Sequence, residues 1–273
     1  MEIQSKVNIP KIIHLCWFSG DEYPEGIKEC LDSWKRVLPD YQVKMWTKDM
    51  ALATGIPFVK EAIDQRKWAF AADVIRVYAL YKDGGIYADS DIFFLKRFDE
   101  LLTNKLILFH EYTKSHFEKR NPKGMFDKEG HNLIKGKAVI GLNIQAALMI
   151  SEPNHPFMKQ LLDYYKNIHF VHNDGTLHMD IIAPQIYALE LEKWGYRYVN
   201  KKQTLSDSIT IYPAECVGGN NYLRYKESFA VHCVSHSWKP SSKKEKIILR
   251  IKKVIKKMLF MKDKATVKSF EKY

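Results

Sequence analysis

The stretch Ala71–Asp91 reads AADVIRVYALYKDGGIYADSD and contains the features that decide the fold. It begins inside a longer segment, 59–82, in which apolar residues recur at helical spacing, so we expect one helix there. That helix should end at Gly84–Gly85, because glycine adopts the backbone conformations of a helix C-terminal cap. A short apolar strand, 86–88, follows at once and leads into Asp89–Asp91. The stretch therefore predicts a helix–strand unit with two carboxylates just after the strand.

The rest of the chain alternates between apolar strand-like runs and amphipathic helical ones. Strands are expected at 11–18, 41–46, 106–109, 140–150, 209–212 and 229–234, and helices at 24–37, 156–168 and 184–194. Residues 111–137 are polar and without a clear period, which predicts a long surface loop. Alternating strands and helices predict an α/β fold with a mixed, mainly parallel sheet.

Asp89 and Asp91 are candidates for binding a cation. In an open α/β sheet, ligands bind in the crevice outside the carboxyl ends of the strands. Two carboxylates one residue apart at such an end can both reach one hard divalent cation, which would neutralise a diphosphate. The same spacing also occurs in plain polar turns, so the motif alone leaves both interpretations open.

The preceding helix contributes a second charged pair. Asp73 and Arg76 are three residues apart and therefore share one helix face. The surrounding sequence, WAFAADVIRVYALY, is otherwise largely apolar. Charged side chains in such a segment should pair with each other or serve a site, so a structural ion pair and a ligand-binding pair both fit.

The stretch Ala71–Asp91 resembles the sugar-binding DXD region of glycosyltransferase family 32. Three further segments resemble blocks of that family in the same order. These are IPKIIHLCWF (9–18), Asn143 before an apolar run, and FAVHCVSHSW (229–238) with its histidine and Ser-Trp pair. The resemblance implies a GT-A-type fold of the nucleotide-diphospho-sugar transferases, in a single domain, 1–238, followed by a tail, 239–273.

The resemblance also implies roles for residues around the donor. Trp17 would stack on the nucleobase, and His14 of the same block would be a second donor-binding residue. Asp73 and Arg76 would hold the hydroxyls of the donor sugar and help to orient the leaving diphosphate. Asn143 would contact the donor sugar or the reaction centre.

A second group of residues would hold the cation and the diphosphate. Asp89 would reach the ribose and the metal, and Asp91 would bind Mn²⁺ or Mg²⁺ directly. His232 or His236 would add a contact to metal or phosphate, and the motif does not decide which. The residues that would close over the diphosphate are Ser237 and Trp238.

The implied activity is that of a metal-dependent, retaining glycosyltransferase. It would move a hexose or N-acetylhexosamine from a nucleotide sugar, with UDP preferred and GDP open, to a glycan acceptor. A lipid-linked oligosaccharide of capsule or O-antigen synthesis is the expected acceptor. The alternative is a catalytically inactive protein of the same fold that acts as a membrane-surface adaptor. The presence of Asp73, Arg76, Asp89 and Asp91 together favours the enzyme.

The net charge of +11 is concentrated in one segment. Residues 239–273 carry 13 Lys and Arg against 3 Asp and Glu, whereas the other 238 residues carry 30 against 29. A nearly neutral body lacks the distributed basic surface of a nucleic-acid-binding protein, so no nucleic-acid partner is expected. Within 243–261, apolar residues form a helical stripe flanked by Lys and Arg. This pattern favours binding to an anionic membrane surface, or alternatively packing onto the domain.

Several features favour a cytoplasmic location. No apolar run reaches the roughly 18 residues that a membrane-spanning helix needs. The N-terminal segment lacks the pattern of a secretory signal, and the four cysteines form no CxxC pair. We therefore expect a cytoplasmic enzyme held peripherally at the inner face of the cell membrane by its tail.

Three histidines lie close together at His169, His172 and His178. Their spacings of three and six residues match no metal-binding signature. A solvated loop and a lining of the acceptor cleft are the two interpretations that remain.

Overall fold

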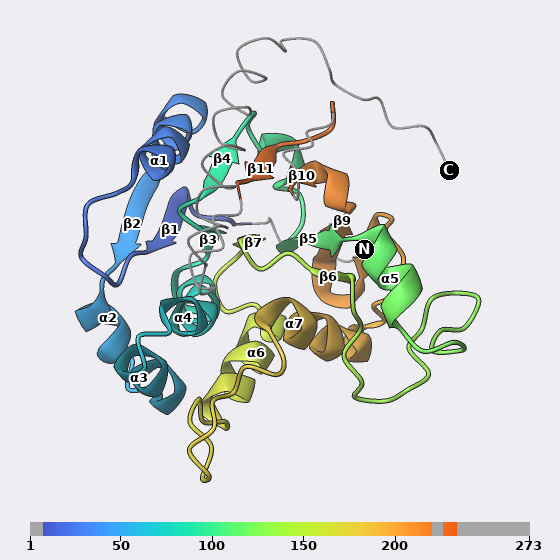
Figure 1. Ribbon diagram of the computed structural model, residues 1–273. Helices are drawn as coiled ribbons and strands as arrows, with labels where there is room; N and C mark the ends of the chain where they lie inside the picture. The colour runs from blue at the N-terminus through green and yellow to red at the C-terminus, as the bar shows by residue number, and fades with distance from the viewer. Residues whose placement is uncertain (1–7, 220–225, 234–273) are drawn as a thin grey trace, which may run out of the picture.

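The computed structural model describes residues 8–219 and 226–233 of the chain (Figure 1). In these residues the α-helices are α1 (Glu25–Val37), α2 (Lys48–Leu52), α3 (Pro57–Asp64), α4 (Trp68–Asp83), α5 (Lys114–Arg120), α6 (Pro156–Lys166) and α7 (Ala183–Leu191). The strands are β1 (Ile12–Cys16), β2 (Gln42–Trp46), β3 (Gly85–Ala88), β4 (Ile92–Phe94), β5 (Leu106–Tyr112), β6 (Leu142–Ile144), β7 (Leu148–Ser151), β8 (Gln203–Leu205), β9 (Ile209–Tyr212), β10 (Val217–Gly218) and β11 (Ala230–His232). The predicted α/β class is confirmed.

The central sheet has the strand order β2-β1-β3-β7-β5-β9-β8, with β6 also paired to β5. Strand β1 is parallel to β2 and β3, and β5 is parallel to β9. Strand β7 is antiparallel to both of its neighbours, β3 and β5, and β6 and β8 are antiparallel to their partners as well. The mixed sheet is thus confirmed, but the predicted dominance of parallel pairing is wrong. Parallel neighbours need a crossover connection, whereas β6 and β7 simply return along β5.

Strands β6 and β7 form one interrupted strand along β5. Ile144 pairs with His110 and Ile150 pairs with Ile107. An advance of six residues from β6 to β7 therefore matches an advance of only three residues along β5. The three extra residues, 145–147, form a bulge where we expected an unbroken strand from 140 to 150. Bulges of this kind often lie beside functional sites because they redirect the chain. Here the backbone amide of Asp89 donates to the carbonyl oxygen of Ala147 (2.9 Å) within the bulge.

Helices and a small sheet cover the two faces of the central sheet. Figure 1 shows α4, α6 and α7 on one side, and α1 with the sheet β10-β11-β4 on the other. Side chains alternate between the two faces along each strand. On β5, Leu106 and Leu108 pack into the core beneath α4, α6 and α7, while Ile107 and Phe109 pack into the opposite core.

The expected helix 59–82 is two helices, α3 and α4, which is a correction. Arg66 has a φ of 53°, and the Lys67 amide donates to the Ala62 carbonyl (2.8 Å), so the chain turns between them. The predicted end at the two glycines is confirmed. Both have positive φ, and a Cβ on Gly85 would lie 2.5 Å from the Ile12 carbonyl oxygen.

Two further features bear on the expectations from sequence. The expected irregular loop 111–137 contains the short helix α5, and its first residues belong to β5. Across residues 8–219 and 226–233, no helix is both long and apolar enough to cross a membrane. The amphipathic segment 243–261 lies outside the described residues.

Candidate active site

The acidic turn, 89–91, directly follows β3, as the sequence predicts. The Ile92 amide donates to the Asp89 carbonyl (2.9 Å), which closes a tight turn between β3 and β4. The Asp91 side chain is buried, and that of Asp89 is partly exposed. Both carboxylates therefore stand at the carboxyl end of β3, in the position expected for a ligand site.

Arg76 connects helix α4 with this turn. Its Nη2 atom lies 2.9 Å from Asp73 Oδ1 and 3.4 Å from Asp89 Oδ1, and the residue is only 4% exposed. The guanidinium also stacks over the Tyr87 ring at 4.8 Å, and the Tyr87 hydroxyl donates to Asp89 Oδ1 (2.7 Å). The predicted shared face of Asp73 and Arg76 is confirmed, and the pair extends to the acidic turn.

Burial dominates the electrostatics of this cluster. It raises the pKa of Asp73 to about 7, against the opposing effect of the Arg76 charge. Burial alone would lower the pKa of Arg76, but its neighbours, Asp89 foremost and then Tyr87 and Asp73, raise it well above its ordinary value. Arg76 is therefore a permanent positive charge among carboxylates that water cannot fully solvate.

His232 joins the turn from the far end of the described chain. Strand β11 runs antiparallel to β4, and His232 faces Ile92. Its Nε2 atom lies 3.4 Å from Asp91 Oδ1. Burial lowers the pKa of His232, but the hydrogen bond and charge of Asp91, with Asp89 and Glu111, outweigh it and raise the pKa to about 9. Of the two histidines left open by the sequence, the structure brings His232 to the carboxylates, while His236 lies outside the described residues.

The side chains at this turn fit a hard divalent cation. Ligand atoms of Asp89, Asp91 and His232 all lie within 4.8 Å of one another. Mg²⁺ and Mn²⁺ are commonly held by one or two carboxylates, with the other positions left to water and phosphate oxygens. His232 would join as a ligand only in its neutral form.

Glu111 is a member of this neighbourhood that sequence reasoning missed. It lies on β5, opposite Asn143, and burial raises its pKa while the nearby charge of His232 opposes that rise. The sequence does carry a signal, since Glu111 lies two residues after the apolar run 106–109. Because we expect a surface loop to begin at residue 111, the sequence does not single out Glu111 as a site residue.

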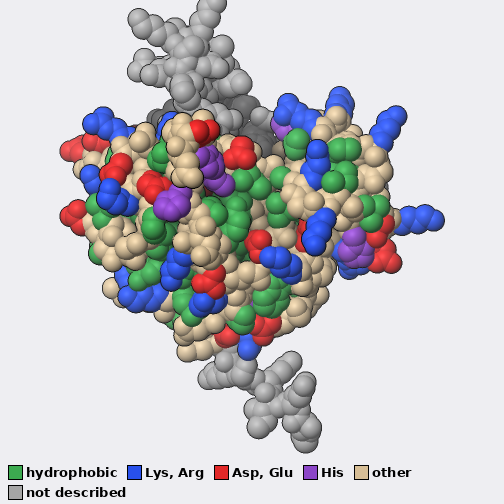
Figure 2. Space-filling view, turned by 90° about the horizontal axis from the view of Figure 1, so that it is seen from below, with side chains coloured by type: hydrophobic (Ala, Val, Ile, Leu, Met, Phe, Trp, Pro, Cys, Tyr) green, Lys and Arg blue, Asp and Glu red, His purple; other side chains and the backbone are tan. Residues whose placement is uncertain are grey.

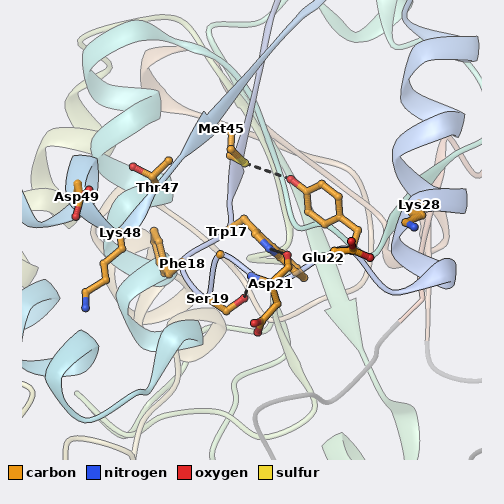
Figure 3. A pocket seen from close by; sticks show the side chains of 12 residues that line it. Trp17, Phe18, Ser19, Asp21, Glu22, Lys28, Met45, Thr47, Lys48 and Asp49 are labelled. Atoms are coloured by element: carbon orange, nitrogen blue, oxygen red, sulfur yellow. Dashed lines mark hydrogen bonds between the residues drawn. The ribbon is translucent and has the colours of Figure 1, made fainter.

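A pocket of about 590 Å³ opens beside the end of β1. Figure 3 shows Trp17 at its centre, with Lys28 and Lys48 on opposite sides. The Trp17 ring packs against Tyr23 (4.7 Å between centroids), and its Nε1 donates to the Asp21 carbonyl (2.7 Å). The indole is thus held in place in the wall of an open pocket.

The end of β1 links this pocket to the acidic turn. Cys16, immediately before Trp17, lies beside Tyr87 and Arg76, and burial raises the pKa of its thiol. The pocket and the charged cluster are therefore built on neighbouring strands, because β1 pairs with β3. Their adjacency follows from the topology of the sheet.

The structure gives His14 and Asn143, two residues predicted to contact the donor, partners within the protein. His14 is fully buried, its Nε2 donating to the Gly84 carbonyl (2.9 Å) while its Nδ1 accepts from Trp46 Nε1 (3.1 Å). Burial lowers its pKa, so it is a neutral structural residue that joins β1, β2 and the end of α4. An enclosed side chain cannot touch a ligand, and the predicted donor contact of His14 is therefore wrong.

Asn143 lies on β6 and is buried. With its amide nitrogen toward the backbone, it donates to the carbonyls of Val139 (3.1 Å) and Leu142 (3.0 Å). These local bonds hold the Asn143 side chain against the chain that precedes the bulge 145–147. Ser237 and Trp238, the last two predicted donor residues, lie outside the described residues.

Comparison with known sequences identifies a matching protein family. A family model for "Capsular polysaccharide synthesis protein" matches residues 1–177. The chain is 37% identical over 105 residues to inositol phosphoceramide mannosyltransferase 2 of Schizosaccharomyces pombe, covering 37% of this chain and 30% of the relative. It is 34% identical over 101 residues to a mannosyl phosphorylinositol ceramide synthase of Saccharomyces cerevisiae, covering 34% and 25%. The chain thus spans less than a third of the length of these curated relatives.

Two solved structures share a coarse likeness. The PaToxG glycosyltransferase aligns with a TM-score of 0.47 and 18% identity, over 68% of this chain and 69% of that one. Mouse xyloside xylosyltransferase 1 aligns with a TM-score of 0.47 and 10% identity, over 84% and 99%. The family match, in contrast, contains Trp17, α4 and the acidic turn, and it ends before β11.

Proposed function

Because the chain belongs to the capsular polysaccharide synthesis protein family, we propose that it is a metal-dependent glycosyltransferase of the GT-A type, with the DXD motif of family 32. It transfers a hexose or N-acetylhexosamine from a nucleotide sugar to a glycan acceptor, with retention of configuration. One observation carries this proposal: Arg76 is shared by Asp73 and Asp89, beside the Asp91–His232 pair, at the carboxyl end of β3. That arrangement suits a negatively charged ligand that arrives with a cation.

The pocket around Trp17 supports binding of the nucleotide half of the donor. A half-buried indole braced by Tyr23 offers a flat face on which a base can stack. Lys28 and Lys48 in the pocket wall can attract an anionic nucleotide. UDP remains the preferred nucleotide and GDP stays open, and mannose joins the candidate sugars because the fission yeast relative is named as a mannosyltransferase.

The charged cluster supports the chemical step. Asp89, Asp91 and His232 would hold Mn²⁺ or Mg²⁺, which supplies positive charge opposite the diphosphate of the donor. Arg76 adds a fixed positive charge where negative charge grows as the diphosphate leaves. Asp73, held by Arg76, can accept hydrogen bonds from the hydroxyls of the donor sugar.

Retention needs no protein nucleophile in this scheme. The acceptor hydroxyl attacks the anomeric carbon on the face from which the diphosphate departs. The new carbon–oxygen bond forms as the carbon–phosphate-oxygen bond breaks, and the proton passes from the acceptor to the phosphate oxygen. Mass spectrometry of enzyme quenched during turnover should detect no glycosyl-enzyme, and a trapped glycosyl-enzyme would contradict this part of the proposal.

The acceptor is the least defined partner. The named acceptor of the fission yeast relative, inositol phosphoceramide, is a lipid, which supports a lipid-linked acceptor for this chain as well. The basic segment 243–261 would then hold the enzyme at the anionic inner face of the cell membrane. This arrangement would raise the local concentration of enzyme near a capsule or O-antigen intermediate.

A donor-hydrolysis screen tests the proposal. Full-length protein with Mn²⁺ is incubated with UDP- and GDP-sugars, and released nucleotide is measured for wild type, Asp91→Asn and Trp17→Ala. Asp163→Asn, on an exposed carboxylate of α6, serves as the matched control. We expect release from one donor, lost in Asp91→Asn, reduced about tenfold or more in Trp17→Ala, and unchanged in Asp163→Asn. If no donor is hydrolysed and no nucleotide binds, the inactive adaptor replaces the enzyme as the better account.

A further inference from the structure

A hairpin between α6 and α7 gathers polar side chains outside the candidate active site. Its two arms pair at Val171 and Leu177, and the His172 amide donates to the Thr176 carbonyl (2.8 Å). Gly175, with a φ of 82°, permits the tight turn at the tip. Figure 1 shows this hairpin projecting below α6 and α7, away from the small sheet that contains β4 and β11.

The register of the hairpin brings together histidines that are six residues apart in sequence. With Val171 opposite Leu177, His172 and His178 become diagonal neighbours on one face of the ribbon. Their ring centroids lie 5.5 Å apart. Asp180 follows two residues after His178, the spacing that returns a side chain to the same face of an extended chain.

These three residues make a set of metal-binding donors. One ligand atom from each of His172, His178 and Asp180 lies within 4.8 Å of the other two. Around a tetrahedral Zn²⁺ with bonds of about 2.0 Å, ligand atoms are about 3.3 Å apart, so small side-chain rotations complete the site. Two imidazoles, one carboxylate and a water molecule form a common open zinc site.

The environment of His178 also favours a bound cation. Its Nε2 atom is buried and, among the described residues, has no hydrogen-bond partner. A buried polar atom without a partner costs free energy that a ligand can offset. The Phe58 ring packs edge-on against His178 (5.8 Å) and limits its movement.

His169 differs from its neighbours on the same hairpin. Its Nδ1 lies 2.6 Å from Glu61 Oε1, and Glu61 also accepts hydrogen bonds from the amides of Phe170 and Val171. This residue anchors the hairpin to α3. Figure 2 shows histidine side chains beside acidic ones on the face that the hairpin presents.

We propose that His172, His178 and Asp180 form a binding site for a first-row transition cation such as Zn²⁺. The site is separate from the acidic turn after β3 and does not depend on the proposed function. It joins both arms of the hairpin to the segment that leads into α7. A bound ion would therefore fix this hairpin as a covalent cross-link would.

Calorimetric titration of metal-free, full-length protein with Zn²⁺ tests the site, and visible spectra of bound Co²⁺ report four-coordinate geometry. His172 and Asp180 are exposed, so His172→Ala and Asp180→Asn should leave the fold intact. His116→Ala, on an exposed histidine of α5, is the matched control. The Asp91→Asn variant shows whether Zn²⁺ binds at the acidic turn instead of at the hairpin.

We expect His172→Ala and Asp180→Asn each to weaken Zn²⁺ binding tenfold or more and to abolish the Co²⁺ bands. His116→Ala and Asp91→Asn should keep both signals. Zn²⁺ binding that is unchanged in His172→Ala and Asp180→Asn, or lost only in Asp91→Asn, would overturn the proposal. Absence of Zn²⁺ binding by wild type would overturn it as well.

Discussion

Two arginines of this chain each lie between two aspartates, in opposite surroundings. Arg97 is on the surface, with Asp40 and Asp99 at 2.7 and 2.5 Å. Arg76 lies in the candidate site, with its two aspartates at 2.9 and 3.4 Å, and is almost completely buried. The exposed cluster has the shorter contacts, and the buried cluster has the looser ones.

The comparison shows that contact distance alone does not identify a functional charge. Around Arg97, water and salt screen the charges, so short contacts add little to stability. Around Arg76, the charges have lost much of their hydration, and each must find its partners within the site. A long contact there indicates hydrogen-bonding capacity that a ligand can use.

The largest expected effect is on stability. Arg76→Gln leaves the carboxylates of Asp73 and Asp89 without their buried cationic partner, and we expect a loss of about 3–5 kcal/mol in the free energy of unfolding. Arg97→Gln should leave the urea unfolding midpoint nearly unchanged. Equal effects of the two substitutions in urea titrations would show that burial does not distinguish the clusters.

The second largest expected effect is on donor turnover, which should depend on Arg76 but not on Arg97. Arg76→Lys keeps a positive charge and avoids the unpaired carboxylates, but one ammonium cannot reproduce the planar fork that spans two aspartates. We expect donor turnover to fall about 10²–10³-fold, as for loss of a group that stabilises the transition state. Arg97→Lys should match wild type under the same assay. A folded Arg76→Lys enzyme with full turnover would remove Arg76 from the mechanism.

The buried side chain of His110 should make the stability of the fold depend on pH. Burial lowers the pKa of His110 to about 4, from the usual histidine value of about 6.5, while its Nδ1 lies 3.2 Å from the Tyr196 hydroxyl. Between pH 6.5 and 4 the unfolded chain binds the proton and the folded chain does not. The contribution of His110 is therefore complete above about pH 6.5 and falls by up to about 3 kcal/mol as the pH drops to 4.

Urea unfolding at pH 7 and pH 4 measures the contribution of His110 to the free energy of unfolding. His110→Gln should shrink the difference in unfolding free energy between the two pH values. His116→Gln, on an exposed side chain, should leave that difference as in wild type. An unchanged difference in His110→Gln would mean that other groups account for acid destabilisation.

The basic segment 243–261 should act through the number of its charges rather than through any single one. Each Lys near an anionic membrane contributes about 1 kcal/mol. Replacing Lys253, Lys256 and Lys257 together by Glu should therefore weaken binding to vesicles containing phosphatidylserine by about 100-fold or more, without changing donor hydrolysis in solution. Co-sedimentation with vesicles measures the change. Equal sedimentation of the variant and wild type would contradict a membrane role for the tail.

Local patterns predicted much of the fold. Periodicity and glycine placement gave β1, α1, β2, β3, α6 and the end of α4. The break between α3 and α4 was not predicted, because only a positive φ at Arg66 marks it. The reversal of β7 was not predicted either, because strand direction depends on long-range pairing rather than on local apolar spacing.

Some residues of the candidate site could be predicted from local sequence, and others could not. Asp73, Arg76, Asp89 and Asp91 lie within one helix–strand unit, so their proximity follows from local structure. His232 reaches that unit only through the pairing of β11 with β4, and sequence left it undecided against His236. The cluster of His172 with His178 and Asp180 likewise required the register of a hairpin, since linear spacing gave no signature.

The account rests most directly on the claim that the acidic turn after β3 binds a nucleotide diphosphate together with a divalent cation. Calorimetric titration of the full chain with UDP and GDP, with and without Mn²⁺, measures this. We predict that one nucleotide binds only with Mn²⁺, and that Asp91→Asn weakens the binding at least tenfold while Arg97→Gln does not. Binding that is equally tight without Mn²⁺, unaffected by Asp91→Asn, or absent for both nucleotides would contradict the account.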